Sequence, residues 1–274
     1  MRILVNILLW LLSCQYVLAQ AVSSIPLSSQ EKNRLYNSQW NGRKVAFLGD
    51  SITDKKRIGT NYLYWEYLVD WLSIAPYVYG KSGHTWKDLL QQSEALVADG
   101  IDSLSTIVLF AGTNDFNSSV PLGTLFKEDY VFVNHNGNRV ERKRRTFTLN
   151  HESYYGRINT VFHYLKSKFP EQQIIVLTPM HRGFAQFSLY NVQPDERHAN
   201  AEGLFIDDYV HALKSAAMQW SIPVVDLFGA VNLQPLMESN AIFFADKDND
   251  LLHPNTLGHE RMARFIAYQM LVLP

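Results

Sequence analysis

The sequence contains a single cysteine among its 274 residues, Cys14, which lies in an apolar stretch close to the N-terminus. A framework of internal disulfides is therefore excluded, and so is a structural zinc site built on cysteine. An excess of charge is also missing, because 25 Lys and Arg accompany 26 Asp and Glu. Nothing in that balance indicates a nucleic-acid partner. Apolar residues make up 47% and charged residues 19%, so we expect stability to come from an ordinary globular core.

Residues 1–19 have the organisation of a secretory signal peptide. Arg2 supplies the positive charge, Ile3–Leu12 is the apolar core, and small residues up to Ala19 suit a cleavage site. The apolar stretch is too short to span a bilayer comfortably. We therefore expect a secreted or periplasmic protein whose mature chain has no transmembrane segment. A second interpretation is lipoprotein processing, which would leave a lipid anchor on Cys14.

After a polar lead-in over residues 20–42, strand-like and helical patterns alternate through residues 43–274. The expected strands are Lys44–Leu48, Tyr77–Tyr79, Thr106–Ala111, Gln173–Thr178 and Ile222–Leu227, and the expected helices are Tyr62–Ile74, Trp86–Ala98, Tyr155–Phe169, Glu202–Trp220 and Thr256–Leu271. Several of these strands are apolar at every position, which is typical of strands covered on both faces. The pattern predicts one α/β domain, a three-layer α/β/α sandwich with a flavodoxin-like parallel sheet of about five strands.

Residues 116–150 interrupt this alternation. A β-type run over Tyr130–Val133 is followed by Asn136-Gly137, a favoured hairpin turn, and then by a second run over Arg139–Leu149. We therefore expect a β-hairpin inserted into the domain.

Three residues far apart in the chain have the chemistry of a nucleophile and its activating pair. Ser51 directly follows the first predicted strand, and we expect Asp250 and His253 to lie together on one short loop before the last helix. A serine hydroxyl is a poor nucleophile until a histidine takes its proton, and a carboxylate fixes the tautomer of that histidine. Asp246 and Asp248 are further candidates for the carboxylate, but only Asp250 has the spacing of the motif described below.

Other polar residues follow the predicted strands at the same edge of the sheet, where sites form in open parallel sheets. A tetrahedral intermediate of acyl transfer carries an oxyanion that needs hydrogen-bond donors. The backbone N–H groups of Ser51 and Gly83 and the side-chain amide of Asn114 could supply them. Gly80 is an alternative to Gly83, and Asn114 could instead only cap a helix.

Four short blocks together resemble the SGNH, or GDSL, hydrolase superfamily. In chain order they are Gly49-Asp50-Ser51, Ser82-Gly83, Gly112-Thr113-Asn114-Asp115 and Asp250-x-x-His253-Pro254. The resemblance implies Ser51 as nucleophile, Asp250 and His253 as the acid–base pair, and Gly83 and Asn114 as oxyanion donors. The chain departs from the family pattern at Ile52, where leucine is common, and at Val78, where asparagine is often found.

This resemblance implies an esterase that acts through an acyl-enzyme, without a metal or other cofactor, on small acyl esters, lipids or acetylated sugars. Export favours extracellular polymers, so we expect an acylated carbohydrate as substrate and O-acetyl ester hydrolysis as the reaction. A lysophospholipase or thioesterase, a non-catalytic carbohydrate-binding protein and an acyltransferase are the alternatives. The expected substrate contacts, together with the hairpin insertion at the same edge as Ser51, are His84, Trp86, Phe116, His181 and Arg182. The sequence leaves the oligomeric state open.

Overall fold

The computed structural model describes residues 26–273, and its centre is a parallel sheet of five strands in the order β2-β1-β3-β6-β9. The strands are β1 (Lys44–Gly49), β2 (Ala75–Val78), β3 (Leu104–Phe110), β6 (Gln173–Leu177) and β9 (Val224–Val225). The predicted signal peptide and Cys14 lie outside the described residues. Within residues 26–273, no helix has the length and apolar character needed to cross a membrane.

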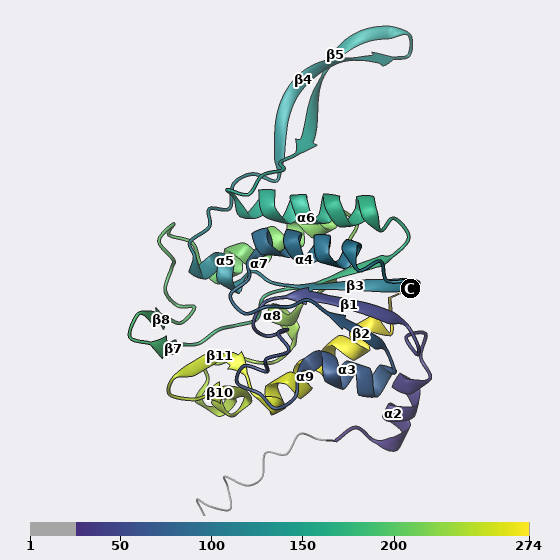
Figure 1. Cartoon of the computed structure of the whole chain (residues 1–274). Helices are drawn as coiled ribbons and strands as arrows, with labels where there is room; N and C mark the ends of the chain where they lie inside the picture. The colour runs from purple at the N-terminus through teal and green to yellow at the C-terminus, as the bar shows by residue number, and fades with distance from the viewer. Residues whose placement is uncertain (1–25, 274) are drawn as a thin grey trace, which may run out of the picture.

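Helices cover both faces of this sheet (Figure 1). The helices are α3 (Tyr64–Leu72) and α9 (Thr256–Met270) on one face, and α4 (Trp86–Ala98), α6 (Tyr154–Lys168) and α7 (Ile206–Gln219) on the other. Side chains of β1 alternate between the two cores: Val45 and Phe47 pack toward α3 and α9, whereas Ala46 and Leu48 pack toward the other helices. This confirms the predicted three-layer α/β/α sandwich.

The predicted lead-in over residues 20–42 is partly helical and packs against the end of the chain. Helix α2 (Ser29–Tyr36) begins with a capping box between Ser28 and Glu31. The Tyr268 hydroxyl of α9 donates to the same Glu31 carboxylate over 2.7 Å. The Trp40 indole N–H donates to the carbonyl of Met270 over 2.8 Å. The first and last described elements are therefore tied together.

A second, four-stranded sheet in the order β10-β11-β7-β8 was not predicted. Its strands are β7 (Ala185–Ser188), β8 (Asn191–Gln193), β10 (Phe244–Asp246) and β11 (Asp250–Pro254), and the remaining short elements are α5 (Thr113–Asn117), α8 (Leu227–Ala230) and the 3₁₀ helix η1 (Glu238–Phe243). Strands of three to five residues leave little periodic signal in a sequence. As a result, Asp250 and His253 lie in a strand and not in the loop that we expected.

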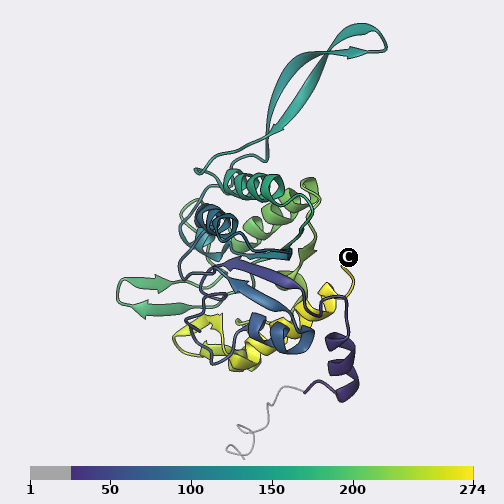
Figure 2. The ribbon, with the colours of Figure 1, turned by 45° about the vertical axis from the view of Figure 1, so that its right-hand side comes forward.

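The predicted hairpin insertion forms β4 (Phe126–His135) and β5 (Asn138–Phe147), joined at Asn136-Gly137 with both residues at positive φ. Its base rests on the helices: the Phe147 ring stacks on Trp220 at 4.1 Å, and Asn159 of α6 donates to the Thr148 carbonyl. From this base the β4–β5 hairpin extends away from β10 and β11 (Figures 1 and 2). Our expectation that it lies at the edge occupied by Ser51 is wrong, because its connecting segments turn outward over α6.

Candidate active site

Ser51, His253 and Asp250 form a continuous hydrogen-bonded chain. The Ser51 Oγ and His253 Nε2 atoms are 2.9 Å apart, and His253 Nδ1 is 2.9 Å from Asp250 Oδ2. Ser51 and His253 are buried, with 6% and 5% of their surface exposed. The imidazole can therefore accept the serine proton at one nitrogen while the other nitrogen donates to the carboxylate.

The turn that carries Ser51 is held by backbone contacts at the end of β1. The N–H groups of Thr53 and Asp54 both donate to the Asp50 carbonyl, so one helical turn starts at the strand end. A side chain at Gly49 would not fit, because its Cβ would lie 2.6 Å from the Phe110 carbonyl oxygen of β3. Glycine at this position therefore lets β1 and β3 approach closely just before Ser51.

Asp250 is held in place by the same strand that carries His253. Its Oδ1 atom accepts hydrogen bonds from the backbone N–H groups of Leu252 and His253, at 3.2 and 2.9 Å. Asp246, one of the other carboxylates considered, instead accepts from the backbone N–H groups of Asp248 and Asn249 in the preceding turn. Of these acids, only Asp250 contacts the imidazole in the structure.

The segments that carry the expected oxyanion donors are joined to one another. The Asn114 amide Nδ2 donates to the His84 carbonyl over 2.9 Å, and the Lys81 N–H donates to the Gly49 carbonyl over 3.0 Å. Gly83 has φ +79°, and nothing lies within 4 Å of the position of a Cβ. Its backbone is thus exposed in a conformation that favours glycine. The Asn114 amide keeps a second N–H for another acceptor.

A buried carboxylate links two of these segments. Asp115, adjacent to Asn114, is completely buried and accepts from the Trp86 backbone N–H at 2.9 Å. Its other oxygen pairs with Arg157 of α6 at 2.8 Å. Burial raises the pKa of Asp115 to about 6, against the opposing effects of these hydrogen bonds and of the Arg157 charge. Asp115 therefore holds the start of α4, just after Gly83, against helix α5, which carries Asn114.

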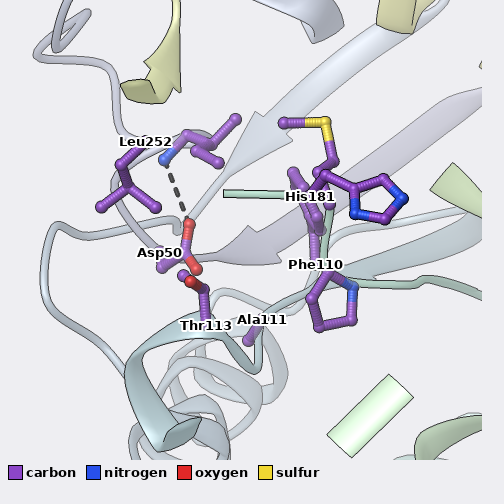
Figure 3. A pocket seen from close by; sticks show the side chains of 9 residues that line it. Asp50, Phe110, Ala111, Thr113, His181 and Leu252 are labelled. Atoms are coloured by element: carbon purple, nitrogen blue, oxygen red, sulfur yellow. Dashed lines mark hydrogen bonds between the residues drawn. The ribbon is translucent and has the colours of Figure 1, made fainter. Parts of the chain in front are cut away.

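Asp50, the residue before Ser51, lines a small cavity of about 10 Å³ together with Thr113, His181 and others (Figure 3). This is roughly the room that one water molecule needs. The Asp50 carboxylate accepts from the Ile52 N–H at 3.1 Å. Burial raises the pKa of Asp50 to about 7. The acid of the Gly-Asp-Ser block thus lines this small cavity.

Three of the five expected substrate contacts are buried in the structure. Trp86 is fully buried and packs edge-on against Phe162, and Phe116 packs in the same way against Tyr209. Arg182 is 1% exposed, and its guanidinium donates to Thr113 and Gln193. These side chains support the loops around Ser51 but present no surface to a ligand in this conformation.

The other two expected contacts, His84 and His181, are partly exposed. His84 Nδ1 lies 2.8 Å from the Gln92 side-chain amide, and His181 Nδ1 lies 2.8 Å from the Glu196 carboxylate. Both rings therefore have fixed orientations at the edge of the sheet that carries Ser51. His259, in contrast, is buried in α9 and accepts from the Tyr64 N–H. Burial lowers its pKa to about 3, which agrees with a structural role.

The sequence analysis missed an aromatic side chain next to His253. The Phe187 ring of β7 lies 5.3 Å from the imidazole, measured between ring centroids. Phe187 is 43% exposed. Among the described residues, no group of three or more His, Cys, Asp or Glu side chains is arranged to hold a metal ion.

Comparison with known proteins places this chain in a family. A model of the GDSL-like lipase/acylhydrolase family matches residues 47–261, a range that contains Ser51, Gly83, Asn114, Asp250 and His253. The chain belongs to this family. It is accordingly an enzyme of the carboxylic ester hydrolase class, and the resemblance read from the four sequence blocks is confirmed. No curated protein matches the chain.

Solved structures share the fold at low sequence identity. A protein from Lactobacillus plantarum is 20% identical, with a TM-score of 0.61 over 84% of this chain and 97% of that one. An acetyl xylan esterase from Geobacillus stearothermophilus is 20% identical, with a TM-score of 0.53 over 84% and 95%. An alpha/beta hydrolase from the metagenome of Lake Arreo, Spain, is 20% identical, with a TM-score of 0.53 over 87% and 99%. At these identities the similarity establishes the fold alone.

Proposed function

We propose that the protein is a secreted serine ester hydrolase that removes acetyl or other short acyl groups from carbohydrate through an acyl-enzyme. The observation that carries the mechanism is the hydrogen-bonded chain from Ser51 through His253 to Asp250, with both links at 2.9 Å. Secretion is part of the proposal and depends on the signal-like residues 1–19.

In the first half of the reaction, Ser51 Oγ attacks the ester carbonyl while His253 Nε2 takes the hydroxyl proton. Asp250 stabilises the imidazolium that forms and keeps its Nδ1 proton in place. The tetrahedral intermediate collapses when the bond to the alcohol breaks, and His253 returns its proton to the leaving alkoxide. The acyl group is then bonded to Ser51.

In the second half, water enters the place of the alcohol and loses a proton to His253. The resulting hydroxide attacks the acyl-enzyme, the bond to Ser51 Oγ breaks, and the serine regains its proton. Both tetrahedral intermediates carry an oxyanion. We assign its stabilisation to the N–H groups of Ser51 and Gly83 and to the Asn114 amide, in segments that are already hydrogen-bonded to one another.

The preference for a short acyl group on a carbohydrate is supported by one of the proteins of similar fold. An acetyl xylan esterase among the proteins of similar fold is consistent with this choice. A lysophospholipase or thioesterase remains the second candidate, favoured by the exposed Phe187 beside His253 and by the exposed Leu189 that follows β7.

The test is release of acetate from a panel of acetylated polysaccharides, measured beside hydrolysis of a lysophospholipid and of an acyl thioester. We expect acetate release by the wild type and none above background by Ser51→Ala. The variant should unfold at the same urea concentration as the wild type. Hydrolysis of the lysophospholipid or thioester alone would replace the carbohydrate assignment and keep the mechanism. Equal activity of Ser51→Ala would refute the mechanism.

A further inference from the structure

The β7–β8 hairpin carries an unusual surface for a segment so close to His253. Its sequence, from Gly183 to Pro194, contains no charged side chain in twelve residues. Four large apolar side chains on it are exposed: Phe187, Leu189, Tyr190 and Val192. Leu189 and Tyr190, at the tip, are 84% and 99% exposed. Apolar groups gathered in this way next to a reactive centre indicate a binding surface.

The hairpin is firmly attached to the strand that carries the acid–base pair. The Gly183 N–H donates to the Leu251 carbonyl at 2.8 Å, and the Gln186 N–H donates to the Asn249 carbonyl at 2.8 Å. At its other end, the buried Arg182 guanidinium donates to the Gln193 side chain at 2.7 Å. Because β7 is paired with β11, the hairpin and His253 belong to one sheet, and the hairpin projects outward from it (Figure 2).

The short distance between Phe187 and His253 suits contact with the alcohol half of an ester. His253 Nδ1 is occupied by Asp250, and Nε2 faces Ser51. The alcohol oxygen must come within hydrogen-bond distance of Nε2 to receive its proton. The Phe187 ring lies 5.3 Å from the imidazole, a separation that an alcohol of several atoms at Nε2 can span.

The composition of the hairpin indicates the kind of alcohol. Its apolar side chains are interspersed with uncharged polar ones, and the amides of Gln186 and Asn191 are also exposed. Aromatic rings can cover the apolar face of another ring, and amides both donate and accept hydrogen bonds. A lipid surface would gain nothing from the amides, whereas a neutral sugar ring has both C–H faces and hydroxyl groups.

We propose that the β7–β8 hairpin is the binding platform for the alcohol half of the ester. Phe187 stacks against the pyranose ring that carries the acyl group, and Tyr190 at the tip contacts the next sugar unit. This inference rests on the proposed carbohydrate esterase function and identifies its specificity-determining residues. Phe187 and Tyr190 position the substrate and take no part in proton transfer.

The experiment compares Phe187→Ala, Phe187→Tyr and Tyr190→Ala with the wild type on three esters. These are ethyl acetate, an acetylated methyl pyranoside and an acetylated neutral oligosaccharide. The control is Tyr130→Ala, which removes an aromatic ring that is 68% exposed on the distant β4–β5 hairpin. All variants are first checked for the wild-type urea midpoint.

For Phe187→Ala, kcat/KM should fall about tenfold on both sugar esters, the size expected for loss of one aromatic contact. It should stay within about twofold of the wild type on ethyl acetate, and Phe187→Tyr should restore it. Tyr190→Ala should impair only the oligosaccharide, and Tyr130→Ala should impair none of the three esters.

Two results separate this inference from the function on which it rests. If the wild type hydrolyses the sugar esters and Phe187→Ala does so equally well, the platform is refuted and the carbohydrate esterase stands. If the wild type hydrolyses no sugar ester, the carbohydrate assignment fails. The role of Phe187 is then tested with 2-naphthyl acetate, an ester whose alcohol half is an aromatic ring. An unchanged preference of Phe187→Ala for naphthyl over ethyl acetate then overturns the platform as well.

Discussion

Replacing Arg157 with methionine should destabilise the protein, and the loss should grow as the pH rises above 6. Arg157 donates to the completely buried Asp115 carboxylate at 2.8 Å, and the arginine side chain is itself only 14% exposed. Methionine keeps most of the apolar stem of Arg157 but leaves the buried carboxylate without its cation. Breaking a buried ion pair in this way typically costs about 3–5 kcal/mol, a large part of a typical folding free energy.

The pH dependence follows from the direction of the pKa shift. Burial raises the pKa of Asp115 from 3.8 to about 6 in the folded protein. The folded state therefore favours the protonated form, and stability declines as the pH rises from about 4 through about 6. Without Arg157, which lowers this pKa, the decline should continue to higher pH. This decline in the free energy of unfolding is at most about 1.4 kcal/mol per pH unit for one group. The stability lost by Arg157→Met relative to the wild type should therefore be about 2–3 kcal/mol larger at pH 8 than at pH 6.

The assay is urea unfolding of wild type and Arg157→Met at pH 5, 6.5 and 8. The control is Arg144→Met, which breaks a pair with Asp129 in which both side chains are about half exposed. Exposed pairs contribute about 0–1 kcal/mol, so this variant should lose little stability at any of the three values. A penalty for Arg157→Met that is the same at pH 5 and pH 8, or no larger than the control, would refute the role assigned to this buried pair.

Three further outcomes follow from the site. Asn114→Ala should lower kcat by about 10²-fold or more with little change in KM, because its amide stabilises charge only near the transition state; an unchanged kcat would exclude an oxyanion role. Replacing residues 127–146 with a short Gly-Ser turn should leave acetate release from small esters and polysaccharides unchanged, because the ribbon points away from β11; selective loss on polysaccharide would show that it reaches the substrate. Dialysis against EDTA should leave activity intact, since proton transfer needs only Ser51, His253 and Asp250; a loss restored by a divalent ion would contradict this mechanism.

The sequence was sufficient to predict the elements whose pattern is long and regular. The apolar runs of β1, β3 and β6 identify the sheet, and the helical periodicity of α6 and α9, each 15 residues long, identifies its two covering layers. Two of the four family blocks carry Ser51, Asp250 and His253, which the structure joins by hydrogen bonds. Such motifs can be recognised in a sequence because catalysis requires particular residue types at particular positions after the strands.

What could not be predicted depends on contacts between distant segments. A position directly after a strand shows at which edge of the sheet a residue lies, but not whether its side chain faces solvent. The side chains of Trp86 and Arg182 are buried against other segments. The contact between Phe187 and His253 arises because Ala185 pairs with Asp250 across two very short strands. Neither strand has a periodic sequence pattern, so the residues that contact His253 could be identified only from the structure.

The most direct test of the account is to identify the covalent nucleophile. A fluorophosphonate that reacts with activated serine hydroxyls is added to the wild type, Ser51→Ala and His253→Ala, and the adduct is mapped by mass spectrometry. We expect one adduct on Ser51 in the wild type and none in Ser51→Ala. Labelling of His253→Ala should be slowed by about 10³-fold or more, because the members of a triad act as a unit. An adduct on another serine, or labelling of His253→Ala at the wild-type rate, would contradict it.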